Sequence, residues 1–201
     1  MGKNRSRRDD NLRRHLAYLA ARLMAEEGIA DYGTAKQKAA RQAGLVDANL
    51  LPDNREIEAA LREFQELYQS DQQPAELRRL REVAVKVMRD FAEFRPALVG
   101  AVLNGTANQF SEVALQLFTD DTKALTLFLL NRRYRFEMAE KRVRIGNAWA
   151  NLPLVHLEVD DAPVTLTVYS RDDERVAPRQ RAAAEGPARA RLDEVEALLG
   201  A

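Results

Sequence analysis

The first half of the chain carries apolar residues at alternating three- and four-residue steps, the spacing of amphipathic helices. This pattern predicts four helices, over about 11–27, 34–43, 53–68 and 74–91. The flanking residues agree, because Asp53 and Glu56 have the spacing of a capping box and Pro74 suits a first helical turn.

The pattern changes after Arg95 and Pro96, where short apolar runs replace the helical stripes. Ala97–Val99 has the composition of a buried strand, and Val113–Phe118 alternates as a second strand. Further strand structure is predicted over 134–145, 154–159 and 164–169, with turns at 146–147 and 160–163. Short helices are predicted over 122–130 and 188–199.

These elements predict an α+β fold, in which a helical N-terminal half packs on a small mixed β-sheet. The expected regions are a disordered basic arm (1–10), a helical region (11–93), an α/β core (94–170), and a linker with a C-terminal helix (171–201). All regular strands are expected between residues 95 and 170.

Composition excludes several classes of site. Lys plus Arg equals Asp plus Glu, so only a local patch is expected to attract nucleic acid. The chain has no cysteine, which excludes disulfides and thiolate sites, and two histidines do not make a histidine-rich metal centre. A P-loop motif is missing. Because no apolar run is long enough to span a bilayer, we expect a cytoplasmic protein without a membrane partner.

The segment between the first two predicted strands combines glycines with small residues. It contains Gly100-Ala101, then Gly105-Thr106-Ala107, then Ser111-Glu112-Val113-Ala114-Leu115. Glycines allow a ligand to approach the backbone closely, and backbone N–H groups can bind phosphate. We therefore expect the turn from Gly100 to Ala107 to lie at the mouth of a concave surface.

This layout resembles the motif of the minimal, polymerase-beta-like nucleotidyltransferases: Gly-Ser, then Gly-x-Ala, then Ser-Asp-[Ile/Val]-Asp-Leu. The resemblance implies that Gly100, Ala101, Gly105 and Thr106 bind a nucleotide, and that two carboxylates on the second strand hold Mg²⁺. In this chain Ala101 replaces the serine of the motif, Glu112 the first aspartate and Ala114 the second. Glu112 is therefore the one candidate catalytic residue and metal ligand of the motif.

The resemblance also implies a third carboxylate on a strand next to the first pair. The predicted strand 164–168 is the candidate for that position, and there it carries Thr165 and Thr167. The nearest carboxylates are Glu158 and Asp160. His156 shares a strand face with Glu158, and it is either an acid–base group or, as we favour, a tolerated polar residue.

Two groups of cations invite a nucleic-acid interpretation. Lys36, Lys38 and Arg41 lie on one predicted helix, which belongs either to a helix-turn-helix or, as we favour, to a helical hairpin with a solvated face. The other group forms a phosphate-facing patch or, as we favour, solvated charge on a half-buried hairpin: Arg132, Arg133, Lys141, Arg142 and Arg144.

Three functional hypotheses follow. The favoured one is a catalytically degenerate nucleotidyltransferase-fold protein that binds a nucleotide, RNA or a protein partner. The second is an active Mg²⁺-dependent nucleotidyltransferase with a rearranged acidic site, formed by Glu112 with Glu158 or Asp160. The third is an unrelated α+β structural or interaction protein in which Gly100 and Gly105 only shape a turn.

Overall fold

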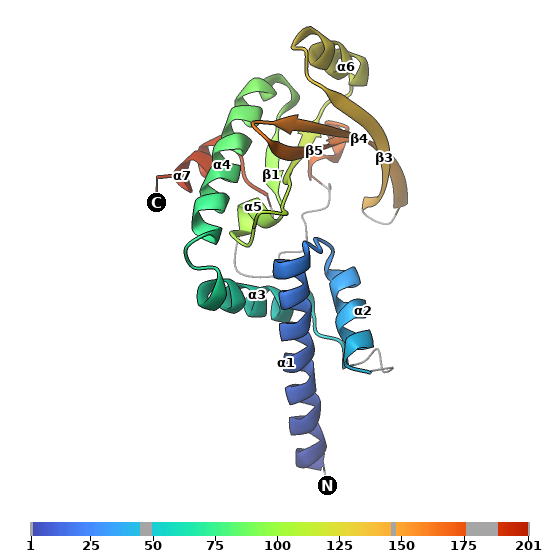
Figure 1. Cartoon of the computed structure of the whole chain (residues 1–201). Helices are drawn as coiled ribbons and strands as arrows, with labels where there is room; N and C mark the ends of the chain where they lie inside the picture. Colours follow the sequence, from blue (N-terminus) through green and yellow to red (C-terminus); the bar gives the residue numbers. More distant parts are fainter. Residues whose placement is uncertain (1, 45–49, 146–147, 176–188, 201) are drawn as a thin grey trace. The chain divides into compact units, whose positions relative to one another are not determined.

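The computed structural model describes residues 2–44, 50–145, 148–175 and 189–200 (Figure 1). The chain forms two compact units. Unit 1 contains the residues up to Pro74 together with Asn108–Phe110, and unit 2 contains most of the chain from Ala75 onward. No helix among the described residues is long and apolar enough to cross a membrane.

Unit 1 is helical, with α1 at Gly2–Glu27, α2 at Tyr32–Gln42 and α3 at Asn54–Tyr68. Its core is a cluster of buried apolar side chains from all three helices, including Leu16, Ala35, Ile57, Leu61 and Phe64. The predicted capping box of α3 is confirmed: Asp53 accepts from the backbone of Glu56 at 2.8 Å, and Glu56 accepts from that of Asp53 at 2.7 Å.

The N-terminal arm differs from the expectation. The sequence predicts disorder over 1–10, whereas α1 begins at Gly2. The charged residues of this arm include arginines with high helix propensity, and no proline interrupts them. The helix therefore begins about ten residues before the apolar stripe that starts at Leu12.

One carboxylate in unit 1 is buried. Glu58 of α3 is 1% exposed, and it accepts hydrogen bonds from Arg62 at 3.0 Å and from the hydroxyl of Tyr32 at 3.3 Å. Burial, followed by the neighbouring charge of Glu58, raises the pKa of Tyr32. The buried charge is thus compensated, as a stable core requires, and the contact joins α2 to α3.

Unit 2 combines helices with a five-stranded mixed sheet, so the predicted α+β class is confirmed. The strands are β1 (Ala97–Val99), β2 (Val113–Phe118), β3 (Phe136–Ile145), β4 (Ala148–Val159) and β5 (Ala162–Tyr169). Their order is β1-β2-β5-β4-β3, in which β2 and β5 are parallel and the other neighbours antiparallel. Every strand of the described residues lies within the predicted range.

The helices of unit 2 are α4 (Gln73–Asp90), α5 (Ala101–Asn104), α6 (Thr122–Asn131) and α7 (Leu192–Ala197). Short 3₁₀ turns follow α4 at Ala92–Phe94 and β5 at Asp172–Arg175. The last helix is shorter than the predicted 188–199, and Ala190 instead bridges Leu98 of β1 through two backbone hydrogen bonds. The predicted turn at Gly146-Asn147 lies outside the described residues, as do residues 176–188, which include most of the predicted linker.

The two faces of the sheet differ in character. One face packs against α4 and α6 and forms the main core, with Leu115, Leu166 and Leu157 against Leu80 and Leu125. By strand register the other face carries Ala114, Gln116, Thr165, Thr167 and His156, and we call it the polar face. The same face also carries a small cluster of buried apolar side chains: Ala97, Phe118, Leu152 and Tyr169.

The β4–β5 connection is tighter than predicted. Only Asp160 and Asp161 lie between the strands, and both have positive φ, 51° and 58°, as in a type I′ turn. Lys86 of α4 contacts both carboxylate oxygens of Asp160 at 2.7 Å, and Arg79 donates to its carbonyl oxygen at 3.1 Å. Helix α4 therefore holds the tip of this hairpin.

Candidate functional site

The glycine-rich segment after β1 is a one-turn helix between two glycines, not the plain turn that the sequence predicts. Gly100 has φ 80° and ψ −157°, and Gly105 has φ 82° and ψ 11°. Between them, Val102 and Leu103 of α5 are buried in the core, which explains why the segment coils inward. Both glycines occupy conformations that side chains disfavour, so each is required by the backbone.

The proposed nucleotide-binding residues differ in exposure. Gly100, Ala101 and Gly105 are half-buried, whereas Thr106 is buried at 4% exposure. Ala101 contributes no hydroxyl, so the segment offers mainly backbone groups to a ligand. That this segment borders a concave surface stays a prediction.

Glu112 takes part in a chain of hydrogen bonds across three strands. It directly precedes β2, and its Oε2 accepts from the hydroxyl of Thr165 on β5 at 2.6 Å. The Oγ1 of Thr165 lies 3.2 Å from Nδ1 of His156 on β4. A threonine hydroxyl has one proton, and Thr165 donates it to Glu112. Thr165 must therefore accept from His156, which assigns the proton of the neutral imidazole to Nδ1.

The positions that would complete a metal site are close to Glu112 but lack carboxylates. Ala114 pairs with Thr165 across the parallel β2–β5 ladder, and Gln116 pairs with Thr167. Side chains of paired residues lie on the same face of a sheet. Register therefore brings together the candidate metal positions of the sequence, and Ala114 and the two threonines supply no charge there.

The two alternative carboxylates are differently placed. Asp160 is bound by Lys86 of α4, the helix that covers the opposite face of the sheet from Thr165. Glu158 is exposed and pairs with Pro163, so β5 separates it from β2. Among the described residues, no group of three or more His, Asp or Glu side chains has the arrangement of a metal site. The structure thus does not bring Asp160 to Glu112.

The cations of α2 have local partners in unit 1. Lys38 forms an ion pair with Glu27 of α1, and Nε of Arg41 donates to the carbonyl of Gln37 at 3.3 Å. Lys36 is half-buried. These contacts agree with the helical-hairpin interpretation, in which the cationic face is solvated.

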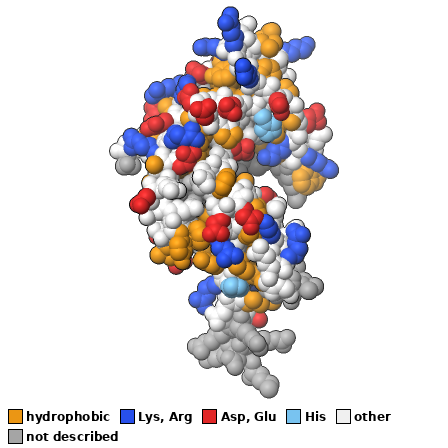
Figure 2. Space-filling view, viewed as in Figure 1, with side chains coloured by type: hydrophobic (Ala, Val, Ile, Leu, Met, Phe, Trp, Pro, Cys, Tyr) orange, Lys and Arg blue, Asp and Glu red, His pale blue; other side chains and the backbone are white. Residues whose placement is uncertain are grey.

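The second cationic group lies on and before β3. Arg132, Arg133, Lys141 and Arg142 are exposed, while the side chain of Arg144 lies outside the described part. Figure 2 shows Lys and Arg side chains gathered at the top of the view, where α6 lies in Figure 1. Next to Arg142 the structure reveals Trp149, 61% exposed, which the sequence analysis did not single out. A lone tryptophan in a polar hairpin was the available signal.

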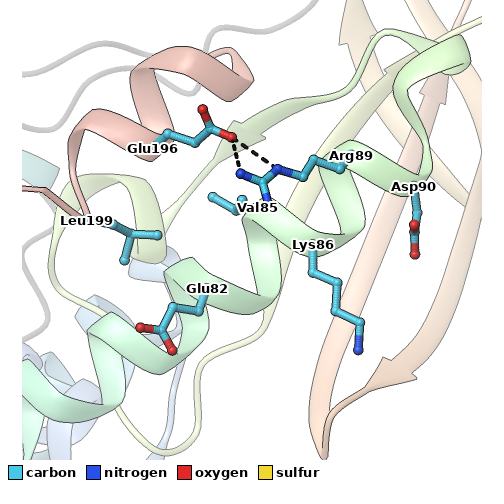
Figure 3. A pocket seen from close by; sticks show the side chains of 7 residues that line it. All are labelled: Glu82, Val85, Lys86, Arg89, Asp90, Glu196 and Leu199. Carbon is cyan, nitrogen blue, oxygen red and sulfur yellow. Dashed lines mark hydrogen bonds and ion pairs between the residues drawn. The ribbon is translucent and has the colours of Figure 1, made fainter.

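A pocket of about 570 Å³ lies between α4 and α7 (Figure 3). Its apolar lining is Val85 and Leu199, and the other lining residues are charged. The charged side chains have partners: Arg89 binds Glu196 at 2.7 Å, and the rest form the pairs Lys86–Asp160, Glu82–Arg78 and Asp90–Tyr134. Burial and the bond to Asp90 raise the pKa of Tyr134 to about 12. Each charged residue that lines the pocket therefore has an ion-pair or hydrogen-bond partner within the protein.

Replacing Thr165 by valine tests the hydrogen-bond chain. Valine keeps the shape but removes the acceptor for Nδ1 of His156, so we expect the neutral imidazole to shift its proton toward Nε2. The chain has two histidines, so ¹⁵N NMR resolves the ring nitrogens of His156 with little overlap. Thr165→Ser, which keeps the hydroxyl, should retain the Nδ1–H form. An unchanged tautomer in Thr165→Val would contradict the assignment.

No protein-family model matches the chain, and no curated protein does. Among solved structures, a cytoplasmic RNA terminal U-transferase is similar over 52% of this chain at 17% identity, with a TM-score of 0.37. The match spans 31% of the U-transferase chain. A TM-score of this size does not establish a shared fold.

Proposed function

We propose that the chain is a nucleotidyltransferase-like protein that binds a nucleotide and does not transfer it. One observation carries the proposal: Glu112, Ala114 and Thr165 occupy neighbouring positions where the resembled family is expected to have carboxylates. The proposed binding residues are Gly100, Ala101, Gly105 and Thr106, in the segment between β1 and β2.

The loss of transfer follows from the chemistry of the side chains. Two-metal phosphoryl transfer needs converging carboxylates that hold Mg²⁺ at both the attacking and the leaving oxygen. Here Glu112 already accepts a hydrogen bond from Thr165, and Ala114 has no ligand atom. Removing metal contacts worth several kcal/mol slows the reaction by several powers of ten, at about 1.4 kcal/mol per tenfold change.

Nucleotide binding is supported by the backbone of the glycine segment. Glycine at position 100 has no Cβ to keep a phosphate away from the chain, and α5 begins directly after it. Positions 100, 101 and 105 remain half-buried, not fully enclosed. The segment ends five residues before Glu112, the spacing that the resembled motif has between its glycine turn and its carboxylates.

The transfer test uses purified protein, Mg²⁺ or Mn²⁺, each labelled nucleoside triphosphate in turn, and mixed RNA or protein acceptors. We expect no metal-dependent label transfer above that of Glu112→Gln. The matched control is Glu93→Gln, which removes an exposed carboxylate elsewhere in unit 2. Label transfer that Glu112→Gln abolishes and Glu93→Gln preserves would overturn the proposal in favour of a rearranged active site.

Two further variants test the assignment of positions. Ala114→Asp restores a carboxylate two residues from Glu112 on the same strand face, so it should gain Mn²⁺ binding in electron paramagnetic resonance titrations. Ala101→Ser adds the hydroxyl that the motif expects, and it should tighten nucleotide binding up to about tenfold, the value of one hydrogen bond. If calorimetry detects no nucleotide binding by either the wild type or Ala101→Ser, the proposed nucleotide site is wrong.

A further inference from the structure

The region around β3 is locally cationic in a chain without net charge. Residues 132–144 include six Arg or Lys against two Glu. Five of these cations are exposed, and we call them the cationic edge: Arg132, Arg133, Arg135, Lys141 and Arg142. They lie just before and along β3, the outer strand of the sheet, whose ten residues extend about 33 Å.

The cationic edge is also without carboxylate partners among the described residues. Nine cations elsewhere in the described residues form ion pairs, as Arg78 does with Glu82 and Arg89 with Glu196. None of the ion pairs in the described parts of the chain includes a member of the cationic edge. Arg132 lies over the ring of Phe128, 5.5 Å from its centroid. Exposed cations of this number attract a polyanion.

An aromatic side chain accompanies these cations. Strand β5 pairs with β4 only from Leu154 onward, so the part of β4 from Ala148 to Pro153 forms a two-stranded ribbon with β3. On this ribbon the guanidinium of Arg142 lies 5.1 Å from the ring centroid of Trp149. Because Trp149 is 61% exposed, a planar group can reach its ring and stack on it.

Arg133 occupies a position where glycine is preferred. It follows the end of α6 with φ 58°. Two hydrogen bonds close the helix there: the backbone N–H of Arg133 donates to the carbonyl of Leu130, and that of Tyr134 donates to the carbonyl of Leu129. This is the position of the usual C-terminal glycine of a helix. An arginine there is conformationally unfavourable, and such residues concentrate at functional sites.

We infer that β3 and its ribbon bind a single-stranded nucleic acid, with phosphates along the cationic edge and a base stacked on Trp149. The cations alone would fit any polyanion, whereas an exposed tryptophan next to them specifically suits an unpaired base. This surface is separate from the glycine segment, and the inference does not depend on nucleotide binding there. If the protein binds RNA on this surface but binds no nucleotide, the inference of a nucleic-acid surface is supported and the proposed nucleotide site is overturned.

The test uses the intrinsic fluorescence of the protein, because Trp149 is the chain's single tryptophan. Titration with an unstructured single-stranded RNA or DNA 12-mer should quench Trp149. Inorganic polyphosphate, which has charge but no bases, should not quench it, and a duplex or anionic vesicles should bind more weakly than the single strand. Absence of quenching by the single strand, or equal affinity for polyphosphate, would overturn the proposal.

Variants then separate stacking from charge, with affinity measured by fluorescence anisotropy of a labelled 12-mer. Trp149→Ala should weaken binding about 5- to 150-fold, the range for loss of one stacked base. Arg142→Gln should reduce the slope of log affinity against log salt by about 0.7, the single-strand value per cation. The control Arg78→Gln removes the same charge from an ion pair on α4 and should leave this slope nearly unchanged.

Arg133→Gly distinguishes binding from folding, because its two effects have opposite directions. Glycine suits the left-handed position, so the variant should melt no lower than the wild type. The salt slope should nevertheless fall as it does in Arg142→Gln. If Arg133→Gly and Arg142→Gln bind like the wild type, or if Trp149→Ala retains full affinity, the proposed surface is wrong.

Discussion

Phe91→Ala is expected to lower the free energy of unfolding of unit 2 by about 3–5 kcal/mol. Phe91 directly follows α4, is fully buried, and contacts a cluster of rings. Its ring centroid lies 4.9 Å from that of Phe128, 5.5 Å from that of Tyr134 and 6.2 Å from that of Phe94. Truncation leaves a cavity among α4, α6 and the start of β3. Because small proteins have only about 5–15 kcal/mol of total stability, this is a large fraction.

The measurement is urea unfolding followed by circular dichroism, with Leu127→Ala as the matched control. Leu127 is on α6 but 59% exposed, so its truncation removes apolar atoms without opening a cavity. It should reduce stability by less than about 1 kcal/mol. Equal losses in the two variants would show that the aromatic cluster does not hold unit 2 together.

Gly100→Ala is expected to destabilise the protein by about 1–3 kcal/mol. The φ of 80° and ψ of −157° at Gly100 belong to a region that is essentially restricted to glycine. Gly105 has the ordinary left-handed conformation, so Gly105→Ala should be milder, about 1–2 kcal/mol, and Gly105→Asn milder still. Thermal unfolding of the three variants gives the order directly. If Gly105→Ala is the most damaging, the conformation assigned to Gly100 is incorrect.

Much of the fold could be predicted because its elements carry their own local signals. The limits of β1 and β2 agree with the predicted Ala97–Val99 and Val113–Phe118, since each is a short apolar run bounded by turn residues. The Asp53 cap and the start of α4 near Pro74 were equally local. The first half of β4 was not predicted, because Asn151 and Pro153 are unusual in a strand and only pairing with β3 stabilises them.

The candidate site was predictable in its residues but not in its contacts. Glu112, Thr165 and His156 were each considered from the sequence, yet the bond between Glu112 and Thr165 depends on the parallel register of β2 and β5. No local pattern specifies that register. The same limit applies to Asp160. From the sequence its carboxylate was a candidate metal ligand, but in the structure it forms an ion pair with Lys86 of α4.

The parallel pairing of β2 with β5 also bears on how the chain reaches its native state. Strands β3, β4 and β5 follow one another as hairpins, so their contacts are local in sequence and can form within microseconds. Val113, by contrast, pairs with Val164, about 50 residues further along, and closing a loop of that length opposes pairing entropically. We therefore expect the docking of β2 onto a preformed three-stranded meander to limit the folding rate of unit 2. Until β2 docks, the backbone N–H and C=O groups along one edge of β5 stay unpaired. We expect the chain to be most prone to aggregation during that time.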